Sequence, residues 1–368
     1  MTHKSSKEWW HRLPVKFSVR VLLFLVLMAG GFFGWVAYEV RSQRRAVAMI
    51  QKVGGTINFD QGPTNEPQAS TPGSETWAWI STWALDHLGL EYSQGSLIVS
   101  LNGAEIGDED LGTLAALTRI ELLDLSMTRV TDAGLAKLRP LKKLKTLSLT
   151  GTKVGDAGLS HLKEFGELVN LTVGTEVGDA GLIHLKPLRK IMVLGLSNTT
   201  VGDPGLANLE GLDQLLTVNL DDTKVTDAGL VHLAGLTNLH SLSLSETKVG
   251  DSGLVHLERL TGLGYLDLSE TSVTDAGLAH LSGLVRLHGL RLAGTKVDDE
   301  GLISLKGMKR LLTLDLKRTS VTDAGLSHMK GISSLEHLLV GDTRVSPQGM
   351  ADLLVTLPGV AFSESGVR

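Results

Sequence analysis

The chain has 368 residues, with 42 glycines, no cysteine and 4% aromatic residues. The absence of cysteine excludes a disulfide-stabilised scaffold, a cysteine-ligated zinc site and a thiol nucleophile. Residues 1–60 carry nine basic and three acidic residues, whereas residues 97–368 carry 26 basic and 33 acidic residues. Because the bulk of the chain is mildly acidic, its charge argues against a nucleic-acid partner.

The first predicted element is a membrane-spanning helix at residues 21–38. This run, VLLFLVLMAGGFFGWVAY, contains no charged residue. At about 1.5 Å per residue it would extend about 27 Å, close to the hydrocarbon thickness of a bilayer. Trp35 and Tyr38 lie near its end, where amphipathic rings favour the membrane interface. The sequence therefore predicts a single-pass anchor that contacts membrane lipid, the alternatives being a buried core helix or a cleaved signal peptide.

The flanking charges predict the orientation of this anchor. Five basic residues precede it within residues 1–20, and four follow it within residues 41–52. Basic residues are enriched on the cytoplasmic side of membrane helices. The small excess places residues 1–20, a basic N-terminal segment, in the cytoplasm and the C-terminal part on the non-cytoplasmic side.

Residues 39–76 are predicted to form a juxtamembrane helix, which ends at Gly54 and Gly55, and a linker. Residues 56–59 could form a short strand. Residues 61–76 are rich in Pro, Gly, Ser and Thr, a composition typical of a flexible linker or long loop.

Residues 77–105 are predicted to form an N-terminal cap. They begin with Trp77, Trp79 and Trp83, two of which share a helical face. A repeat array needs a cap at its exposed end, and this interpretation is favoured over a binding patch or a membrane-surface helix.

A six-residue phrase recurs along the rest of the chain. It reads VTDAGL at Val130, has a weaker copy at Ile106, and returns at Val154, Val177, Val201, Val225, Val249, Val273, Val297, Val321 and Val345. The spacing is 24 residues, except for 23 between Val154 and Val177.

The unit that starts at Val225 shows what each repeat should form. Its leucines fall three apart from Leu230 to Leu239, which indicates a helix or 3₁₀ segment with one buried face. They then fall two apart at Leu242 and Leu244, which indicates a strand. No such unit can bury its leucines alone, so neighbouring units must stack.

Residues 144–154, LKTLSLTGTKV, match the pattern L-x-x-L-x-L-x-x-N/C-x-L, so residues 97–362 resemble leucine-rich repeat proteins. The resemblance implies an α/β solenoid with parallel strands on the concave face and short helices on the convex face. The repeats would occupy residues 106–344 and a C-terminal cap residues 345–368. Thr replaces the family's Asn, as in Thr152, and is predicted to bond the backbone of adjacent turns.

Two polar columns follow the same period. An Asp such as Asp132 precedes each helical leucine pattern and is interpreted as a helix cap rather than as part of a calcium site. Six histidines, including His232, share one slot that holds Lys137, Asn208 and Ser304 elsewhere. They are therefore interpreted as exposed or rim residues, not as a metal array. Gly174 marks the shortened repeat, where a local kink is expected.

The outward residues of the strands are mostly small and polar. One mixed cluster stands out on three adjacent strands. It comprises Tyr265, Asp267, Arg291, Asp315 and Lys317. Protein-binding hot spots favour Trp, Tyr and Arg, so this cluster is the predicted site for a protein or peptide partner. The alternative is a soluble surface that binds no ligand.

No catalytic motif is present among H-E-x-x-H, G-x-x-x-x-G-K-[ST], G-x-S-x-G and G-x-G-x-x-G. No enzymatic activity, metal or cofactor is predicted. The leading hypothesis is a membrane-anchored interaction module. The alternatives are a spacer element of the cell envelope and, less favoured, an enzyme of unknown type.

A second resemblance supports this hypothesis. The residues FSVR before the apolar run, RRA after it, Gly54-Gly55, Phe59-Asp60 and the VTDAGL repeats together resemble bacterial membrane-anchored leucine-rich repeat proteins. That group implies a single-pass protein without catalytic residues. The repeats are also similar to those of F-box substrate receptors, but no F-box-like segment precedes them, so a ubiquitin role is not expected.

Overall fold

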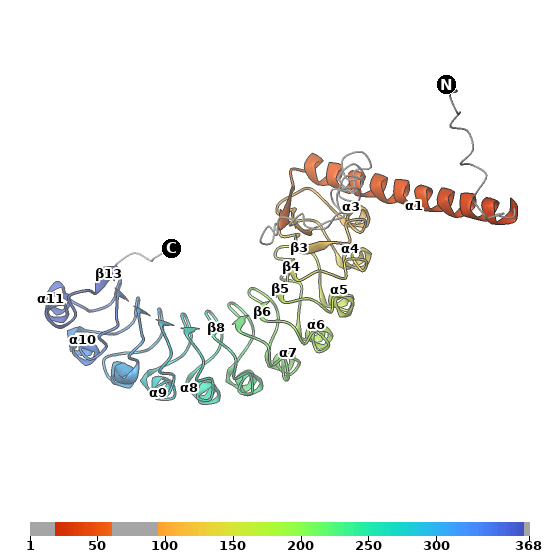
Figure 1. Ribbon diagram of the computed structural model, residues 1–368. Coiled ribbons are helices and arrows are strands. Elements are labelled where there is room, and N and C mark those ends of the chain that lie inside the picture. Colours follow the sequence, from red (N-terminus) through yellow and green to blue (C-terminus); the bar gives the residue numbers. More distant parts are fainter. Residues whose placement is uncertain (1–18, 61–94, 364–368) are drawn as a thin grey trace, which may run out of the picture.

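The computed structural model describes residues 19–60 and 95–363, which form a curved solenoid with a long helix at one end (Figure 1). The strands build one 13-stranded sheet in sequence order. β1 pairs antiparallel with β2, and the later neighbours are parallel. The strands are β1 (Thr56–Asp60), β2 (Ser96–Ser100), β3 (Ile120–Asp124), β4 (Thr146–Ser148), β5 (Asn170–Thr172), β6 (Val193–Gly195), β7 (Thr217–Asn219), β8 (Ser241–Ser243), β9 (Tyr265–Asp267), β10 (Gly289–Arg291), β11 (Thr313–Asp315), β12 (His337–Leu339) and β13 (Ala361–Ser363).

Short helices cover the convex side of this sheet (Figure 1). Several are 3₁₀ turns, as the period near three predicts. The helices are α1 (Val19–Lys52), α3 (Asp108–Leu114), α4 (Asp132–Lys137), α5 (Asp156–Leu159), η3 (Leu162–Glu164), α6 (Asp179–Leu182), η4 (Ile183–Leu185), α7 (Asp203–Leu206), η5 (Asp227–Leu233), α8 (Asp251–Leu254), η6 (Val255–Leu257), α9 (Asp275–Ala279), η7 (Gly301–Gly307), α10 (Asp323–Met329) and α11 (Pro347–Thr356).

The leucines of successive repeats form one continuous core between the strands and the helices. In the unit from Val225, Leu230, Leu233, Leu239, Leu242 and Leu244 are all fully buried. These core leucines therefore pack against their equivalents in neighbouring repeats, and the predicted solenoid with concave strands and convex helices is confirmed.

The repeated Asp connects neighbouring repeats, and its predicted role as the cap of its own helix is wrong. Asp251 is the first residue of α8, not its N-cap, which is Gly250. Its carboxylate accepts bonds from the backbone N–H of Thr274 (2.8 Å) and from the Thr274 hydroxyl (2.6 Å), in the next repeat. Thr274 in turn caps α9 by accepting the Ala276 N–H. One carboxylate thus holds the start of the following helix.

The Gly two residues after each Asp leaves room for this contact. A Cβ on Gly277 would lie 2.4 Å from Asp251 Oδ1. The same overlap recurs at Gly229, where a Cβ would lie 2.4 Å from Asp203 Oδ1. Close approach of the carboxylate, rather than a special backbone angle, therefore requires glycine at this position.

The repeated Thr bonds within its own turn, in contrast to the predicted bond between adjacent turns. Thr247 is buried, and its hydroxyl donates to the Leu244 carbonyl at 2.6 Å, three residues earlier. Thr152 makes the equivalent bond to Leu149 at 2.7 Å. The hydroxyl thus satisfies a carbonyl where the chain leaves the strand.

The shortened repeat at Gly174 lacks one specific residue. The other turns after the strands contain a residue with positive φ, for example Asn198 (58°) or Gly151 (68°). The turn from Val173 to Val177 has no such residue among those with positive φ. Gly174 is buried there, and its Cβ would lie 3.0 Å from the Leu149 carbonyl oxygen. The missing residue of the 23-residue unit is therefore the left-handed position of the turn.

The C-terminal half of α1 covers the N-terminal end of the core. Ala46, Val47 and Ile50 are buried at helical spacing and belong to the same hydrophobic cluster as Leu97 and Leu111. β1 then adds an antiparallel strand to the sheet. The sequence interpretation of residues 39–60 did not include this contact with the repeats. The linker at 61–76 and the tryptophans at 77, 79 and 83 lie outside the described residues.

In the part of the chain that the structure describes, no helix has an apolar stretch long enough to cross a membrane. The span predicted at residues 21–38 is not found there.

The other end of the core is closed by α11. Ser346 caps this helix by accepting the Gly349 N–H at 3.1 Å, and it donates to Asp323 of the preceding repeat. Leu353, Leu357 and Val360 complete the buried cluster. The last repeat therefore keeps the inter-repeat bond while a longer helix covers its leucines.

Candidate functional site

The predicted concave cluster lies on β9, β10 and β11. Arg291 is in register with Asp267 on one side and with Asp315 on the other. Tyr265 is in register with Gly289. Lys317 follows the end of β11 by two residues and is half-buried. The structure therefore brings the predicted residues of neighbouring strands together on one face.

Tyr265 is held in place by its neighbours. Its hydroxyl donates to Asp267 Oδ2 at 3.2 Å. Its ring lies over Gly289, where a Cβ would come within 2.8 Å of Tyr265 Cδ2. Burial, and to a lesser extent the charge of Asp267, raise the pKa of Tyr265, so the phenol is neutral and acts as a donor at physiological pH. Gly289 thus contributes to the site by leaving room for the Tyr265 ring. This role of Gly289 was not identified from the sequence.

Arg291 forms an ion pair with Asp267, with 3.5 Å between Nη1 and Oδ2. Partial burial acts to lower the pKa of Arg291, but Tyr265 and Asp267 outweigh it and raise the pKa above its ordinary value. The side chain of Arg291 is 40% exposed, whereas that of Asp267 is 8% exposed. The guanidinium is therefore the charged group of the pair that a partner can reach.

The two carboxylates of the cluster have structural roles. Asp267 Oδ1 accepts the Ser269 N–H at 2.9 Å, and Asp315 Oδ1 accepts the Lys317 N–H at 3.1 Å. Asp124 makes the same bond to Ser126 at the end of β3. The sequence signal for this structural role was the recurrence of Asp at the same position of several repeats, as in Asp124, Asp267 and Asp315. The carboxylates of Asp267 and Asp315 are therefore partly committed to the backbone, unlike the Tyr265 ring and the Arg291 guanidinium.

The rim beside the cluster holds another ion pair that the sequence did not reveal. Glu270 and Arg318 occupy the positive-φ position of their turns, two repeats apart. Their side chains pair across Gly294, where a Cβ would meet the Glu270 carboxylate. A glycine at the intermediate turn allows the pair to form.

The concave face toward the N-terminus has a different character. Ser126, Ser148 and Thr172 form a chain of hydroxyl bonds of 2.7 and 2.8 Å across β3, β4 and β5. These hydroxyls already have partners within the protein. This part of the face therefore has fewer polar groups ready for a ligand than β9–β11.

The histidine column lies on the convex side. His232 Nδ1 lies 2.6 Å from Glu210 Oε1, and His280 Nδ1 lies 2.7 Å from Glu258 Oε1, each pair joining two repeats. Among the described residues, no group of three or more His, Asp or Glu side chains is arranged to hold a metal ion.

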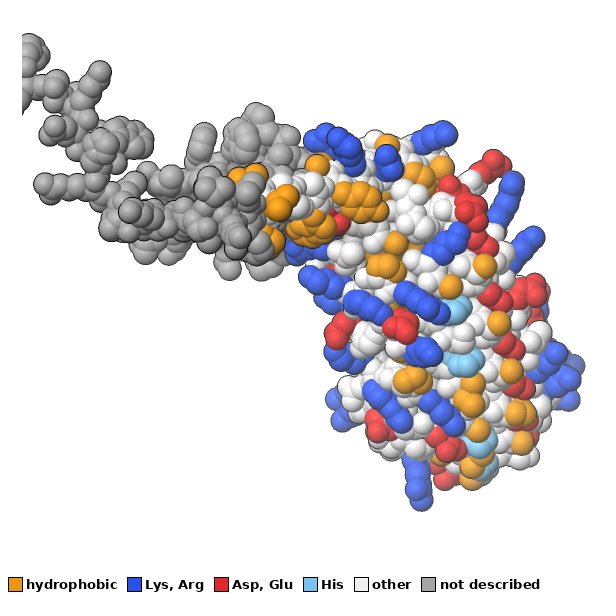
Figure 2. Space-filling model, turned by 90° about the vertical axis from the view of Figure 1, so that its right-hand side faces the viewer, with side chains coloured by type: hydrophobic (Ala, Val, Ile, Leu, Met, Phe, Trp, Pro, Cys, Tyr) orange, Lys and Arg blue, Asp and Glu red, His pale blue; other side chains and the backbone are white. Residues whose placement is uncertain are grey.

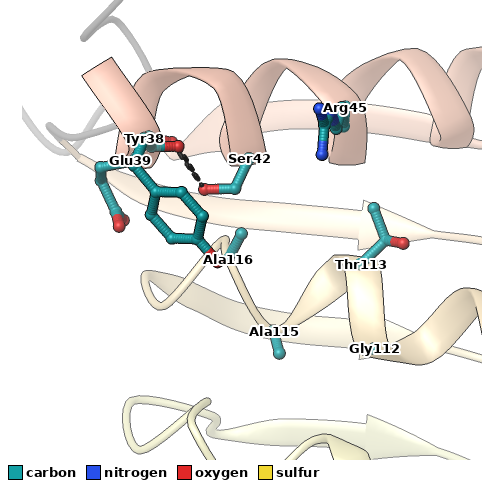
Figure 3. Close-up of a pocket in the computed structure, with 8 residues that line it drawn as sticks. All are labelled: Tyr38, Glu39, Ser42, Arg45, Gly112, Thr113, Ala115 and Ala116. Carbon is teal, nitrogen blue, oxygen red and sulfur yellow. Dashed lines mark hydrogen bonds between the residues drawn. The ribbon is translucent and has the colours of Figure 1, made fainter. Parts of the chain in front are cut away.

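An open pocket of about 340 Å³ lies between α1 and the first repeat (Figure 3). Tyr38, Glu39, Ser42 and Arg45 line it from α1. Gly112, Thr113, Ala115 and Ala116 line it from the other side. The Ser42 hydroxyl donates to the Tyr38 carbonyl at 3.0 Å, within α1 itself. No predicted site residue contributes to this pocket.

Comparisons with known proteins agree with this architecture. A family model described as Leucine Rich repeat matches residues 141–163 and 235–257. No curated protein matches the chain by sequence.

Among solved structures, an internalin (inlF) from Listeria monocytogenes is similar at 20% identity and a TM-score of 0.51, covering 74% of this chain and 87% of that chain. Internalin C2 of the same organism has 22% identity and a TM-score of 0.42, covering 56% of this chain and 84% of its own. A TDR receptor has 15% identity and a TM-score of 0.49, covering 68% of this chain and 44% of its own. The family match over two repeat units, the 24-residue period and the solenoid together identify the fold as a leucine-rich repeat solenoid.

Proposed function

We propose that this protein is a non-catalytic interaction module that binds a protein or peptide partner on its concave face, at Tyr265 and Arg291. The observation that carries the proposal is the preorganised pair itself. Tyr265 is fixed by Asp267 and Gly289, and Arg291 projects beside it with an accessible charge. A side chain that is already ordered loses little entropy on binding, and Tyr and Arg are common hot-spot residues.

Photo-crosslinking tests this proposal in cells. A photoreactive residue replaces Thr313, which is in register with Gly289 and half-buried on the same face. We expect it to capture a partner that is lost when Tyr265→Ala and Arg291→Ala are combined. A photoreactive residue at the exposed convex Val231 serves as the control. Equal capture from both positions, or capture that survives the double substitution, would contradict the proposal.

A spacer role is the second candidate function. The hydroxyls of Ser126, Ser148 and Thr172 favour it, because they bond to one another rather than being directed to a ligand. A spacer should tolerate exchange of β9–β11 repeats for β3–β5 repeats at constant length. An interaction module should lose its phenotype in the same exchange.

We further propose that residues 21–38 attach the module to a membrane, with the repeats on the non-cytoplasmic side. The uncharged run supports this, as do Leu27, Trp35 and Tyr38, which are 61–72% exposed on α1. Removal of residues 1–38 retains the part of α1 that covers the first repeat.

The truncated chain should stay in the supernatant of lysed cells, while the full chain should sediment with membranes and resist alkaline extraction. A full chain that stays in the aqueous phase would refute the attachment. Protease digestion of intact and lysed cells would report the side on which the repeats lie.

A further inference from the structure

One edge of the solenoid, where each convex helix leads back to the next strand, carries an uneven charge. The loops at 137–145, 161–169 and 184–192 together contain nine basic and two acidic residues. The next four loops, at 208–216, 232–240, 256–264 and 280–288, together contain two basic and three acidic residues. Figure 2 shows Lys and Arg side chains gathered on the convex side below α1. The last two loops, at 304–312 and 328–336, together contain four basic residues and one acidic residue. The positive charge is therefore densest in the repeats nearest α1.

Some of these cations have structural partners. Lys142 lies 2.7 Å from Glu164, and it also donates to the Glu164 carbonyl at 3.5 Å. Arg189 donates to the Gly211 carbonyl at the equivalent position of its repeat. These two side chains bind backbone groups at the end of the next helix, where cations are favourable. They are explained by the fold alone.

Among the other basic residues of these loops, Lys137 and Lys145 also form ion pairs, with Glu109 and Glu121. We define the basic edge as Arg139, Lys143, Lys186 and Lys190, which lie nine and 13 residues after Val130 and Val177. All four are exposed, and only Lys190 forms an ion pair with a described residue, Glu167. Arg139 contacts His161 Nδ1 at 3.1 Å, and burial and Arg139 lower the pKa of that histidine, which favours a neutral ring. Most of the positive charge of the edge is thus available to a partner.

The path of α1 places this edge beside the projecting part of the helix. Met49, Lys52 and Val53 line a pocket with residues 103–105, at the edge where the strands lead to the helices. Tyr38 and Glu39 lie instead beside Ala115 and Ala116, which are nine and ten residues after Ile106 and so occupy the edge of Arg139. From Tyr38, α1 continues to Val19, away from the repeats (Figure 1). The helix therefore leaves the solenoid on the side of the basic edge.

We propose that the basic edge lies against the anionic lipid headgroups of the membrane into which α1 projects, so that the first repeats contact the bilayer surface. The inference rests on the proposed attachment through α1. It commits to lipid because α1, with Leu27 and Trp35 exposed, leaves from the same edge as the cations. Basic residues near an anionic bilayer gain favourable energy that falls off within a Debye length.

Vesicle flotation of the full chain tests the proposal with a matched control. One variant combines Arg139→Gln, Lys143→Gln, Lys186→Gln and Lys190→Gln. The control combines Arg286→Gln, Lys306→Gln, Arg310→Gln and Lys330→Gln, which occupy the same two slots of distal repeats, are exposed, and remove the same charge. Vesicles of phosphatidylcholine alone are compared with vesicles that contain about one-third phosphatidylglycerol, at low and high salt.

On the anionic vesicles, the basic-edge variant should bind at least about tenfold more weakly than the parent, whereas the control should change by less than about twofold. The difference should disappear at high salt and on phosphatidylcholine. Equal binding of the two variants to anionic vesicles would overturn the proposal. So would a loss confined to an acidic peptide probe, polyglutamate, which would identify the edge as a protein-binding surface.

Failure of the attachment through α1 gives a separate result. In that case the parent chain would not float with phosphatidylcholine vesicles. This result does not depend on how the affinities of the two variants for anionic vesicles compare.

Discussion

Substitution of Gly277 by alanine tests the bond that connects the repeats. The added Cβ would lie 2.4 Å from Asp251 Oδ1 and 3.1 Å from Leu254 Cδ1, about 1 Å inside ordinary contact for the first of these. The carboxylate would have to move, and its bonds of 2.8 and 2.6 Å to Thr274 would lengthen. An overpacked buried site costs about 1–3 kcal/mol, and a bond to a charged group contributes about 1.5–3 kcal/mol. We expect a loss of about 2–3 kcal/mol.

Gly283→Ala is the control in the same repeat. No atom lies within 4 Å of a Cβ at Gly283, and its φ is not positive. Thermal unfolding of a chain this long shifts by about 2–4 °C per kcal/mol. Gly277→Ala should therefore lower the melting temperature by several degrees, while Gly283→Ala should leave it unchanged or raise it slightly.

A double-mutant cycle isolates the contact with the carboxylate. In an Asp251→Ala background the nearest clashing atom is gone, so Gly277→Ala should cost less than it does in the parent. If Gly277→Ala unfolds at the same temperature as Gly283→Ala, or if the cycle shows no coupling, the proposed reason for the Asp and Gly columns is refuted.

Three further variants probe the core, the site and the contact between Asp275 and Asp298. Leu242→Asp places a carboxylate at a fully buried position, so chemical denaturation should show a loss of about 3 kcal/mol or more that spreads to neighbouring repeats; an unchanged transition would refute the assigned register. Tyr265→Ala combined with Arg291→Ala should weaken a partner identified by crosslinking by about 2 kcal/mol or more, with unchanged circular dichroism, and undiminished affinity would move recognition off this face. At Asp298 a carboxylate occupies the slot of Thr274, and burial together with Asp298 raises the pKa of Asp275. A raised carboxyl pKa in the folded state means that stability falls as pH rises through that pKa, so Asp298→Thr should stabilise the protein at neutral pH and less so under acid; an equal effect at both pH values would contradict this.

The leucine spacing predicted the repeating unit and its stacking, and the resemblance to leucine-rich repeat proteins implied the solenoid. A period near three followed by a period of two specifies a helical turn and a strand from local sequence, and leucines at these positions must be buried by the next copy. The parallel arrangement of the strands was an implication of that resemblance. In the concave cluster, the same register argument predicted that Arg291 lies between Asp267 and Asp315, as observed.

The roles of polar residues depended on the distance and direction between repeats, which no local pattern specifies. Asp251 resembles a helix cap in sequence, yet its carboxylate reaches Thr274 in the next repeat because successive helices stack closely there. Asp267 resembles a free ligand, yet it binds the backbone of Ser269. For each of these two aspartates, more than one hydrogen-bond partner was possible from the sequence, and only the tertiary structure selected between them.

The same reasoning applies to α1. The sequence by itself determined an apolar run followed by a helical segment. That Ala46, Val47 and Ile50 cover the first repeat, and that the helix leaves from the edge of Arg139, was decided by the tertiary structure. A helix can bury a stripe of apolar residues against any surface of complementary shape, so the stripe predicts only that the helix packs against something. The surface against which it packs is set by the leucines at the end of the stack, which would be exposed without α1.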